Sequence, residues 1–218
     1  MNKPVTIQAK ICGLRTEEDV RAAVTAGAAF VGFMHFPKSP RHIEPEAAEK
    51  LTRLLPETVK AVVILVNPSD AEVARAALWA DFIQLHGDET PERCREIRRL
   101  AAKPVIKAMA LENADDLARA ALYQETADIL LFDAKTPTSG DLPGGNGIAF
   151  DWRILAEATL ATPWMLSGGL DAANVAKAVR LTGARMVDVS SGVEETRGVK
   201  SAAKIKAFLQ AVQEASVG

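Results

Sequence analysis

The sequence predicts an α/β fold in which eight parallel strands, each followed by a helix, close into a (β/α)8 or TIM barrel. Eight short apolar runs alternate with longer amphipathic segments along the 218 residues. Most of these runs lack the polar alternation of a half-exposed strand, which indicates strands buried on both faces. Repeated strand–helix alternation is typical of a parallel sheet with right-handed crossovers. At about 27 residues per unit the chain is compact for a barrel, and we expect one domain over residues 1–218.

The strands are expected, in order, at Ile7–Ile11, Phe30–Phe33, Ala61–Val66, Phe82–Leu85, Val105–Ala108, Ile129–Phe132, Trp164–Leu166 and Met186–Val189. Residues that favour helix starts follow these runs at Thr16, Pro45, Ser69, Thr90, Asp115, Asp151, Asp171 and Ser201. An open doubly wound sheet is the alternative fold. It usually has fewer strands and a glycine-rich loop after the first strand, where this chain has only Gly13.

Composition and charge narrow the function classes. The net charge of −2 lacks the basic excess typical of nucleic-acid binding. The arginines within residues 93–99 alternate with glutamates at helical spacing, which indicates a solvated helix face. We find no apolar run long enough for a membrane span and no signal peptide, so we expect a cytoplasmic protein, monomeric by default. Two distant cysteines form no metal or disulfide motif, and we expect neither a metal nor a cofactor.

Polar and glycine residues gather after the predicted strands, where barrel enzymes keep their active sites. Gly168 and Gly169 follow the seventh strand, and Ser190, Ser191 and Gly192 follow the eighth. Glycine lets backbone N–H groups approach an anion, and a short helix starting near Ser191 would direct its positive end there. Two ordinary tight turns are the alternative interpretation. The pairing of these two loops favours a phosphate site.

Cys12 and Asp133, at the ends of the first and sixth strands, are candidates for proton transfer. A thiol can accept a proton if its surroundings favour the thiolate, and a carboxyl of raised pKa can donate one. Alternatively, Cys12 is a small buried apolar residue, and Asp133 is a helix cap or a partner of Lys135. Only their shared position at strand ends favours the catalytic interpretation.

Three further strand-end residues have two interpretations each. Arg41, in a proline-braced loop, is either a bidentate clamp for a carboxylate or phosphate or an ordinary surface arginine. His86 is a substrate contact or a satisfied turn histidine. Lys107 can form a Schiff base in other barrels, but pairing with a carboxylate is favoured here. Cys94, on the fourth helix, is expected to be structural.

Taken in order along nearly the whole chain, a series of short segments resembles the phosphoribosylanthranilate isomerase family of tryptophan biosynthesis. The resemblance lies in Lys10–Leu14, Gly32-Phe33, Ser39-Pro40-Arg41 with Ile43, Gln84–Glu89, Phe132-Asp133, Gly144–Gly147, Phe150–Trp152, Leu166–Leu170, Asn174-Val175, Asp188–Glu194 and Gly198–Lys200. We see no departure at a position that the family uses for chemistry.

The resemblance implies an Amadori rearrangement of a phosphorylated aminoaldose to an aminoketose. It implies that Asp133 is the general acid, that Cys12 is the general base and that Arg41 holds the anthranilate carboxylate. Substrate contacts by His86 and Asp188 are also implied, with Asp188 orienting groups near Cys12. Phosphate contacts are implied for Gly145, Gly168, Gly169, Ser190, Ser191 and Gly192.

Two rival functions remain at this point. One is another phosphate-binding barrel enzyme, a lyase or aldolase that uses Lys107 as a Schiff base. The other is a barrel that binds a sugar phosphate without turning it over, which would need Arg41 and the glycine loops but not Cys12 together with Asp133.

Overall fold

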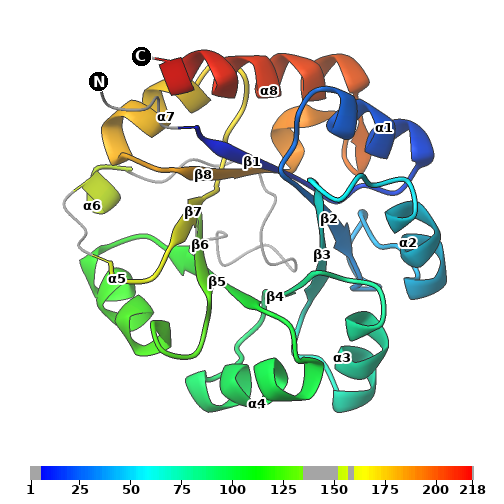
Figure 1. Cartoon of the computed structure of the whole chain (residues 1–218). Helices are drawn as coiled ribbons and strands as arrows, with labels where there is room; N and C mark the ends of the chain where they lie inside the picture. The colour runs from blue at the N-terminus through cyan, green and yellow to red at the C-terminus, as the bar shows by residue number, and fades with distance from the viewer. Residues whose placement is uncertain (1–5, 135–151, 157–159, 218) are drawn as a thin grey trace.

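The computed structural model describes residues 6–134, 152–156 and 160–217, and eight of its strands form a closed parallel barrel (Figure 1). These strands are β1 Gln8–Cys12, β2 Phe30–Met34, β3 Lys60–Leu65, β4 Phe82–Leu85, β5 Val105–Leu111, β6 Ile129–Ala134, β7 Trp164–Leu166 and β8 Met186–Val189. β8 pairs in parallel with β1, with Lys10 opposite Asp188, and this pairing closes the sheet. The predicted barrel is confirmed, and the open-sheet alternative is excluded.

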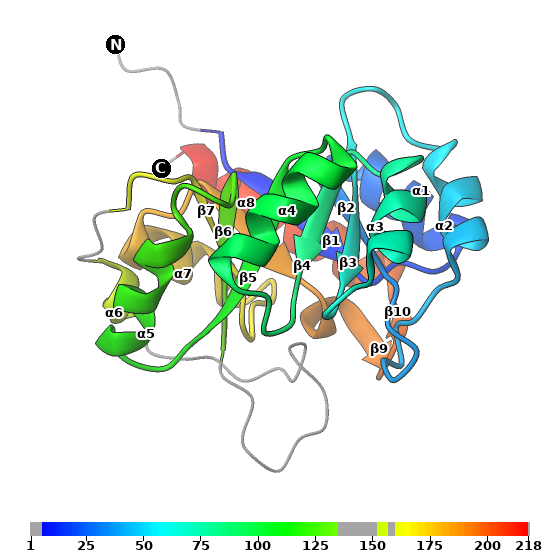
Figure 2. The ribbon, with the colours of Figure 1, turned by 90° about the horizontal axis from the view of Figure 1, so that it is seen from below.

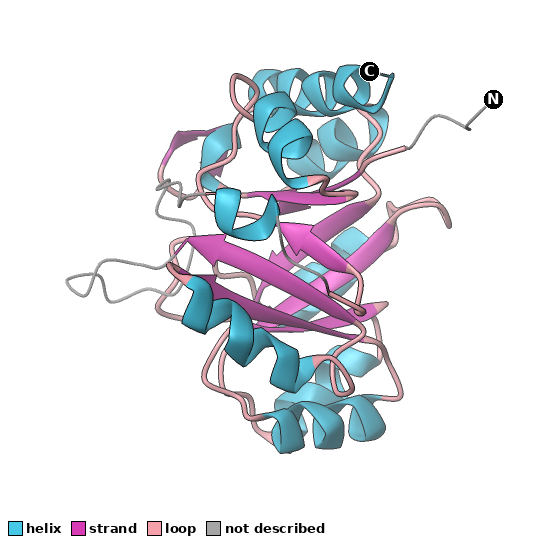
Figure 3. Cartoon of the chain, turned by 90° about the vertical axis from the view of Figure 1, so that its left-hand side faces the viewer, coloured by secondary structure: helices cyan, strands magenta, loops and turns pink. Residues whose placement is uncertain are grey.

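Helices surround the barrel, as the cyan elements around the magenta strands in Figure 3 show. They are α1 Glu17–Thr25, α2 Pro45–Thr52, α3 Asp70–Ala77, α4 Pro91–Ala101, α5 Ala114–Ala120, α6 Arg153–Ala156, α7 Val175–Thr182 and α8 Ala202–Val217, with 3-10 turns η1 Ala121–Tyr123 and η2 Ser191–Val193. Thr16, Ser69 and Thr90 cap α1, α3 and α4 as predicted, each accepting a backbone N–H of the first turn. None of the described helices is both long enough and apolar enough to cross a membrane.

Two predicted helix starts are displaced. α5 begins at Ala114 with Asn113 as its cap, one residue before Asp115. The start predicted at Asp171 is wrong, because its carboxylate accepts the N–H groups of Ala173 and Asn174 and so holds a turn. Helix α7 therefore begins only at Val175. The start predicted at Asp151 lies outside the described residues.

Strand alternation gives the barrel two apolar layers. Phe30 packs inside the barrel with Val62 and Ile106, whereas Val31 and Phe33 belong to the layer between strands and helices. Burial on both faces explains why the strands read as continuous apolar runs.

A short hairpin follows β8. Strands β9 Glu194–Thr196 and β10 Val199–Lys200 pair antiparallel, and Figure 2 shows them projecting from one end of the barrel. This hairpin brings Glu194 and Lys200 toward the pocket described below.

Candidate active site

A pocket that is partly open to solvent is lined by the C-terminal ends of the strands and the loops that follow them. The site residues predicted from sequence that line it are Cys12, Arg41, His86, Asp133, Gly168, Gly169, Asp188, Ser190 and Ser191. Gly192 lies in η2, directly after this wall. Gly145 lies outside the described residues.

The Cys12 thiol lies beside a buried ion pair. Lys10 precedes Cys12 by two residues on β1, so both side chains point to the barrel axis. The Lys10 side chain is fully buried, and its Nζ lies 2.9 Å from Asp188 Oδ1. Ser167 Oγ donates to Asp188 Oδ2 at 3.1 Å. Both carboxylate oxygens of Asp188 therefore have a partner. Asp188 and Cys12 line the same pocket.

Burial raises the pKa of Cys12 above its ordinary value, and Asp188 raises it further. Lys10 and Lys200 oppose this rise by favouring the thiolate. For Lys10, burial opposes the charge, but Asp188 and Cys12 outweigh it and raise the pKa of the ammonium. The resting cysteine is thus mainly a thiol at neutral pH, with a cation beside it that stabilises the thiolate when it forms.

Asp133, near the end of β6, faces a histidine that directly follows β4. His86 Nε2 lies 3.8 Å from Asp133 Oδ2. Burial, with help from Lys107, lowers the pKa of His86 to about 4, so the imidazole is neutral at pH 7 and this contact is not an ion pair there. Gln84 Nε2 lies 3.2 Å from His86 Nδ1. An amide N–H directed at Nδ1 leaves the imidazole proton on Nε2, which faces Asp133. The imidazole of His86 lines the pocket.

The two loops predicted to hold phosphate come together at the pocket. Gly168 and Gly169 have positive φ angles of +85° and +66°, a backbone conformation that residues with a side chain rarely adopt. A Cβ on Gly192 would lie 2.0 Å from the carbonyl oxygen of Leu170, so only glycine permits the two loops to approach this closely. The predicted short helix near Ser191 is present as η2.

Arg41 is a buried residue of the pocket wall, which rules out the surface interpretation. Its Nε and Nη2 donate to the two carboxylate oxygens of Glu194 at 2.7 and 3.0 Å. Lys200 Nζ also donates to Glu194, at 2.8 Å, and to the carbonyl oxygen of Ser190 at the same distance. The β9–β10 hairpin thus fixes the plane of the guanidinium and ties it to the loop after β8.

Lys107 pairs with a carboxylate, as the favoured interpretation predicted. Its Nζ donates to Glu89 Oε2 at 2.8 Å and to the Gly87 carbonyl at 2.6 Å. Both charged side chains are buried beneath the loop after β4, and Lys107 does not line the pocket. Cys94 is fully buried in the core between α4 and the sheet; this burial raises the pKa of its thiol to about 11.

Several functional candidates were missed from the sequence. Lys10 carried a usable signal, because a lysine two residues before Cys12 in an apolar strand must point into the barrel with it. Ser167, which donates to Asp188, lies within the segment Leu166–Leu170 but was not singled out as a site residue. Gln84, Glu194 and Lys200 were not singled out as site residues. Gln84 contacts His86 only two residues away, whereas Glu194 pairs with Arg41, which lies 153 residues earlier.

The chain matches known proteins over nearly all of its length. The model of the N-(5′-phosphoribosyl)anthranilate (PRA) isomerase family matches residues 9–211. The N-(5′-phosphoribosyl)anthranilate isomerase of Parvibaculum lavamentivorans is 48% identical over 215 residues, which cover 97% of this chain and 100% of that protein.

Solved structures agree. The crystal structure of phosphoribosyl anthranilate isomerase from Thermotoga maritima superposes with a TM-score of 0.86 at 36% identity and covers 95% of this chain and 99% of that one. A phosphoribosyl anthranilate isomerase in complex with reduced 1-(o-carboxyphenylamino)-1-deoxyribulose 5-phosphate has a TM-score of 0.82 at 34% identity, with the same coverage. The chain therefore belongs to the N-(5′-phosphoribosyl)anthranilate isomerase family.

Proposed function

We propose that Cys12 and Asp133 carry out the proton transfers of the reaction that this chain catalyses. That reaction is the Amadori rearrangement of N-(5′-phosphoribosyl)anthranilate to 1-(2-carboxyphenylamino)-1-deoxyribulose 5-phosphate in tryptophan biosynthesis. The observation that carries the proposal is that both side chains line one pocket, together with the two glycine-bearing loops.

An aldose–ketose rearrangement needs a proton donor at the ring oxygen and an acceptor at C2. Asp133 protonates the ring oxygen, and the C1–O bond breaks as the substrate nitrogen forms the Schiff base. Cys12 removes the C2 proton, whose bonding electrons form the C1–C2 double bond and neutralise the nitrogen. The resulting enolamine becomes the ketone when its C2 hydroxyl loses a proton and C1 gains one. Proton exchange with solvent then returns Asp133 to the acid and Cys12 to the thiolate. The substrate nitrogen forms the Schiff base, so no enzyme lysine takes part.

The substrate phosphate is assigned to the loops after β7 and β8, through Gly168, Gly169, Ser190, Ser191 and Gly192. Positive φ angles and close loop packing support this assignment, because they present backbone N–H groups without side-chain obstruction. Gly145 keeps its predicted phosphate role as part of the proposal. Binding both the phosphate and the carboxylate would hold the reacting carbons between acid and base, and such positioning lowers barriers by several kcal/mol.

Arg41→Ala is expected to raise KM by roughly 10- to 100-fold, with a smaller change in kcat, because a charge-assisted hydrogen bond contributes about 1.5–3 kcal/mol. Steady-state kinetics measure both parameters. Glu194 loses one of its buried partners in this variant, so thermal unfolding must first show that the protein is folded at the assay temperature. Arg41→Lys tests the planar fork separately from the charge. An unchanged KM in both variants contradicts the clamp.

Lys10 and Asp188 are positioning residues for the base, and their removal should shift the Cys12 pKa in opposite directions. Lys10→Met removes the cation that favours the thiolate and is expected to raise this pKa. Asp188→Asn removes a neighbouring negative charge and is expected to lower it. Because only the thiolate can accept the C2 proton, the rising limb of kcat/KM should move to higher pH in Lys10→Met.

The pH dependence of alkylation of the free enzyme measures the thiol directly. The fully buried Cys94, with its pKa of about 11, contributes little signal. Shifts in the same direction for both variants would show that the ion pair does not tune the thiol.

The isomerase activity is tested by the loss of phosphoribosylanthranilate fluorescence when the freshly prepared substrate is mixed with the purified protein. Borohydride trapping with substrate tests the Schiff-base rival, which predicts a covalent adduct on Lys107. A barrel that only binds would leave the fluorescence unchanged.

The cytoplasmic location and the monomeric state remain part of the proposal, and light scattering of the purified chain tests the monomeric state.

A further inference from the structure

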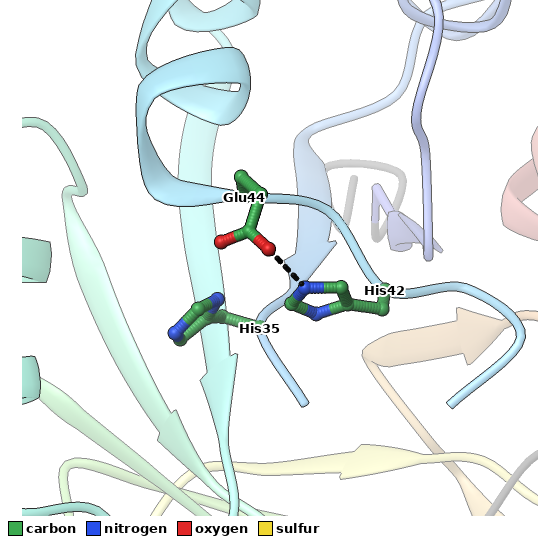
Figure 4. Close-up of side chains that lie close together, drawn as sticks. All are labelled: His35, His42 and Glu44. Carbon is green, nitrogen blue, oxygen red and sulfur yellow. Dashed lines mark hydrogen bonds and ion pairs between the residues drawn. The ribbon is translucent and has the colours of Figure 1, made fainter. Parts of the chain in front are cut away.

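Two histidines and a glutamate meet on the loop between β2 and α2, outside the residues used above. We propose that His35, His42 and Glu44 bind one divalent transition-metal ion, with Zn²⁺ as the best match. One ligand atom from each lies within 4.8 Å of the other two. Figure 4 shows the His42 ring turned toward Glu44, with His35 alongside. Linear spacing gave no reason to expect a metal, because the group forms only when the loop folds back.

The backbone holds both histidines in place without help from a metal. The His35 N–H donates to the Ile64 carbonyl at 2.9 Å, which ties it to β3. At the other end of the loop, Ile43 N–H donates to the Met34 carbonyl at 2.9 Å, and His42 forms a parallel bridge with Met34. The ordering cost of bringing the two rings together is therefore already met by the fold.

The orientation of the side chains suits metal coordination. His35 Nδ1 lies 3.3 Å from the Ile43 carbonyl, which places the ring proton on Nδ1 and leaves a lone pair on Nε2. A backbone carbonyl holding the second ring nitrogen is the usual support of a metal-binding histidine. Glu44 is the N-cap residue of α2, yet its side chain makes no cap hydrogen bond. Instead its Oε1 lies 3.0 Å from His42 Nε2.

Two imidazole nitrogens and one carboxylate oxygen match the ligands of a three-residue zinc site, with water in the fourth position. Metal–ligand bonds of about 2.0–2.2 Å place tetrahedral ligand atoms roughly 3.3 Å apart. The ligand atoms must therefore move closer together by at most about 1.5 Å. Glu44 can supply much of this movement, because its side chain is 69% exposed. The nearby carboxylates of Glu46 and Glu49 are paired with Arg75 and remain outside the group.

Metal binding has one cost that limits affinity. Coordination through His42 Nε2 moves the ring proton to Nδ1, which is buried without a hydrogen-bond partner among the described residues. We therefore expect a reversible site that exchanges with chelators, rather than a structural zinc on which folding depends.

The test is equilibrium binding of Zn²⁺ to the untagged protein, measured by competition with a chromophoric chelator. We expect one Zn²⁺ per chain. Loss of supporting partners alone weakens metal sites by 10- to 100-fold, so we expect His42→Gln and Glu44→Gln to weaken binding by at least about tenfold. Because Glu44 is exposed, Glu44→Gln should fold normally. X-ray absorption of the zinc-loaded protein should show two imidazole ligands.

Two matched controls separate this site from others. Glu46→Gln removes an exposed carboxylate two residues away and should bind Zn²⁺ like the parent chain. His86→Gln removes the third histidine of the chain, which lies in the pocket, and should also leave binding unchanged. The proposal is overturned if the folded parent chain binds no Zn²⁺, if Glu44→Gln and His42→Gln bind it undiminished, or if His86→Gln abolishes binding.

Discussion

Replacing Cys12 with serine is expected to lower kcat by roughly 100- to 10,000-fold, the range that a positioned general base contributes. Serine has nearly the size of cysteine, but its hydroxyl is far less acidic than a thiol, so little of its base form exists at neutral pH. The pocket, the ion pair of Lys10 with Asp188 and the glycine loops all remain. Binding of the reduced product should therefore stay within a few-fold of the parent chain.

Steady-state fluorescence kinetics and titration with the reduced product measure the two quantities separately. Cys94→Ser is the matched control, because Cys94 is buried between α4 and the sheet and does not line the pocket. It should reduce thermal stability while leaving kcat close to normal. Near-normal turnover in Cys12→Ser would remove the thiol from the mechanism.

The surroundings of Cys12 disfavour the thiolate, which is the form that the proposed mechanism needs. Burial raises the pKa of Cys12, so only a fraction of the protein molecules carry the Cys12 thiolate at neutral pH. Activity should therefore rise as the pH increases toward the pKa of Cys12. Without Lys10 beside it the fraction would be smaller still. A fully buried lysine costs several kcal/mol unless paired, and here Asp188 provides the pair. The ion pair is therefore best understood as an arrangement that keeps a cation next to the thiol.

The sequence predicts the barrel and the position of its active site for one physical reason. In a parallel barrel all strands end at the same rim, so residues such as Cys12 and Asp133, distant in the chain, meet once the strands are recognised. The sequence predicts the ends of the strands less accurately than their central residues. β5 continues to Leu111, three residues past the predicted end, where exposure increases and the apolar signal fades.

Side-chain partnerships could not be predicted in this way. Arg41 was recognised as a candidate clamp, but its bidentate partner Glu194 lies 153 residues later on a hairpin that follows the last predicted strand. The neutral state of His86 depends on burial and on Lys107, neither of which is visible in a linear sequence. Such features follow from three-dimensional packing rather than from local propensity.

Asp133→Asn is the second variant with a large expected effect, a fall in kcat of roughly 100- to 10,000-fold. The amide keeps the shape of the carboxyl and can still donate a hydrogen bond, but it cannot transfer a proton to the ring oxygen. His86, whose Nε2 lies 3.8 Å from Asp133 Oδ2, cannot take over this role. Its pKa of about 4 leaves it neutral at pH 7, where it is not a competent acid.

This comparison also decides between the two possible acids. Asp115→Asn removes an exposed carboxylate from the first turn of α5 and should leave kcat unchanged, so a general effect of lost charge is controlled. If His86 were the acid, His86→Gln would lower kcat by roughly 100- to 10,000-fold and Asp133→Asn would not. If Asp133 is the acid, His86→Gln changes mainly KM. The kcat of Asp133→Asn then stays far below that of the parent chain at every pH, while the variant still binds the reduced product. Only the second pattern is compatible with a carboxyl that opens the sugar ring before the thiolate removes the C2 proton.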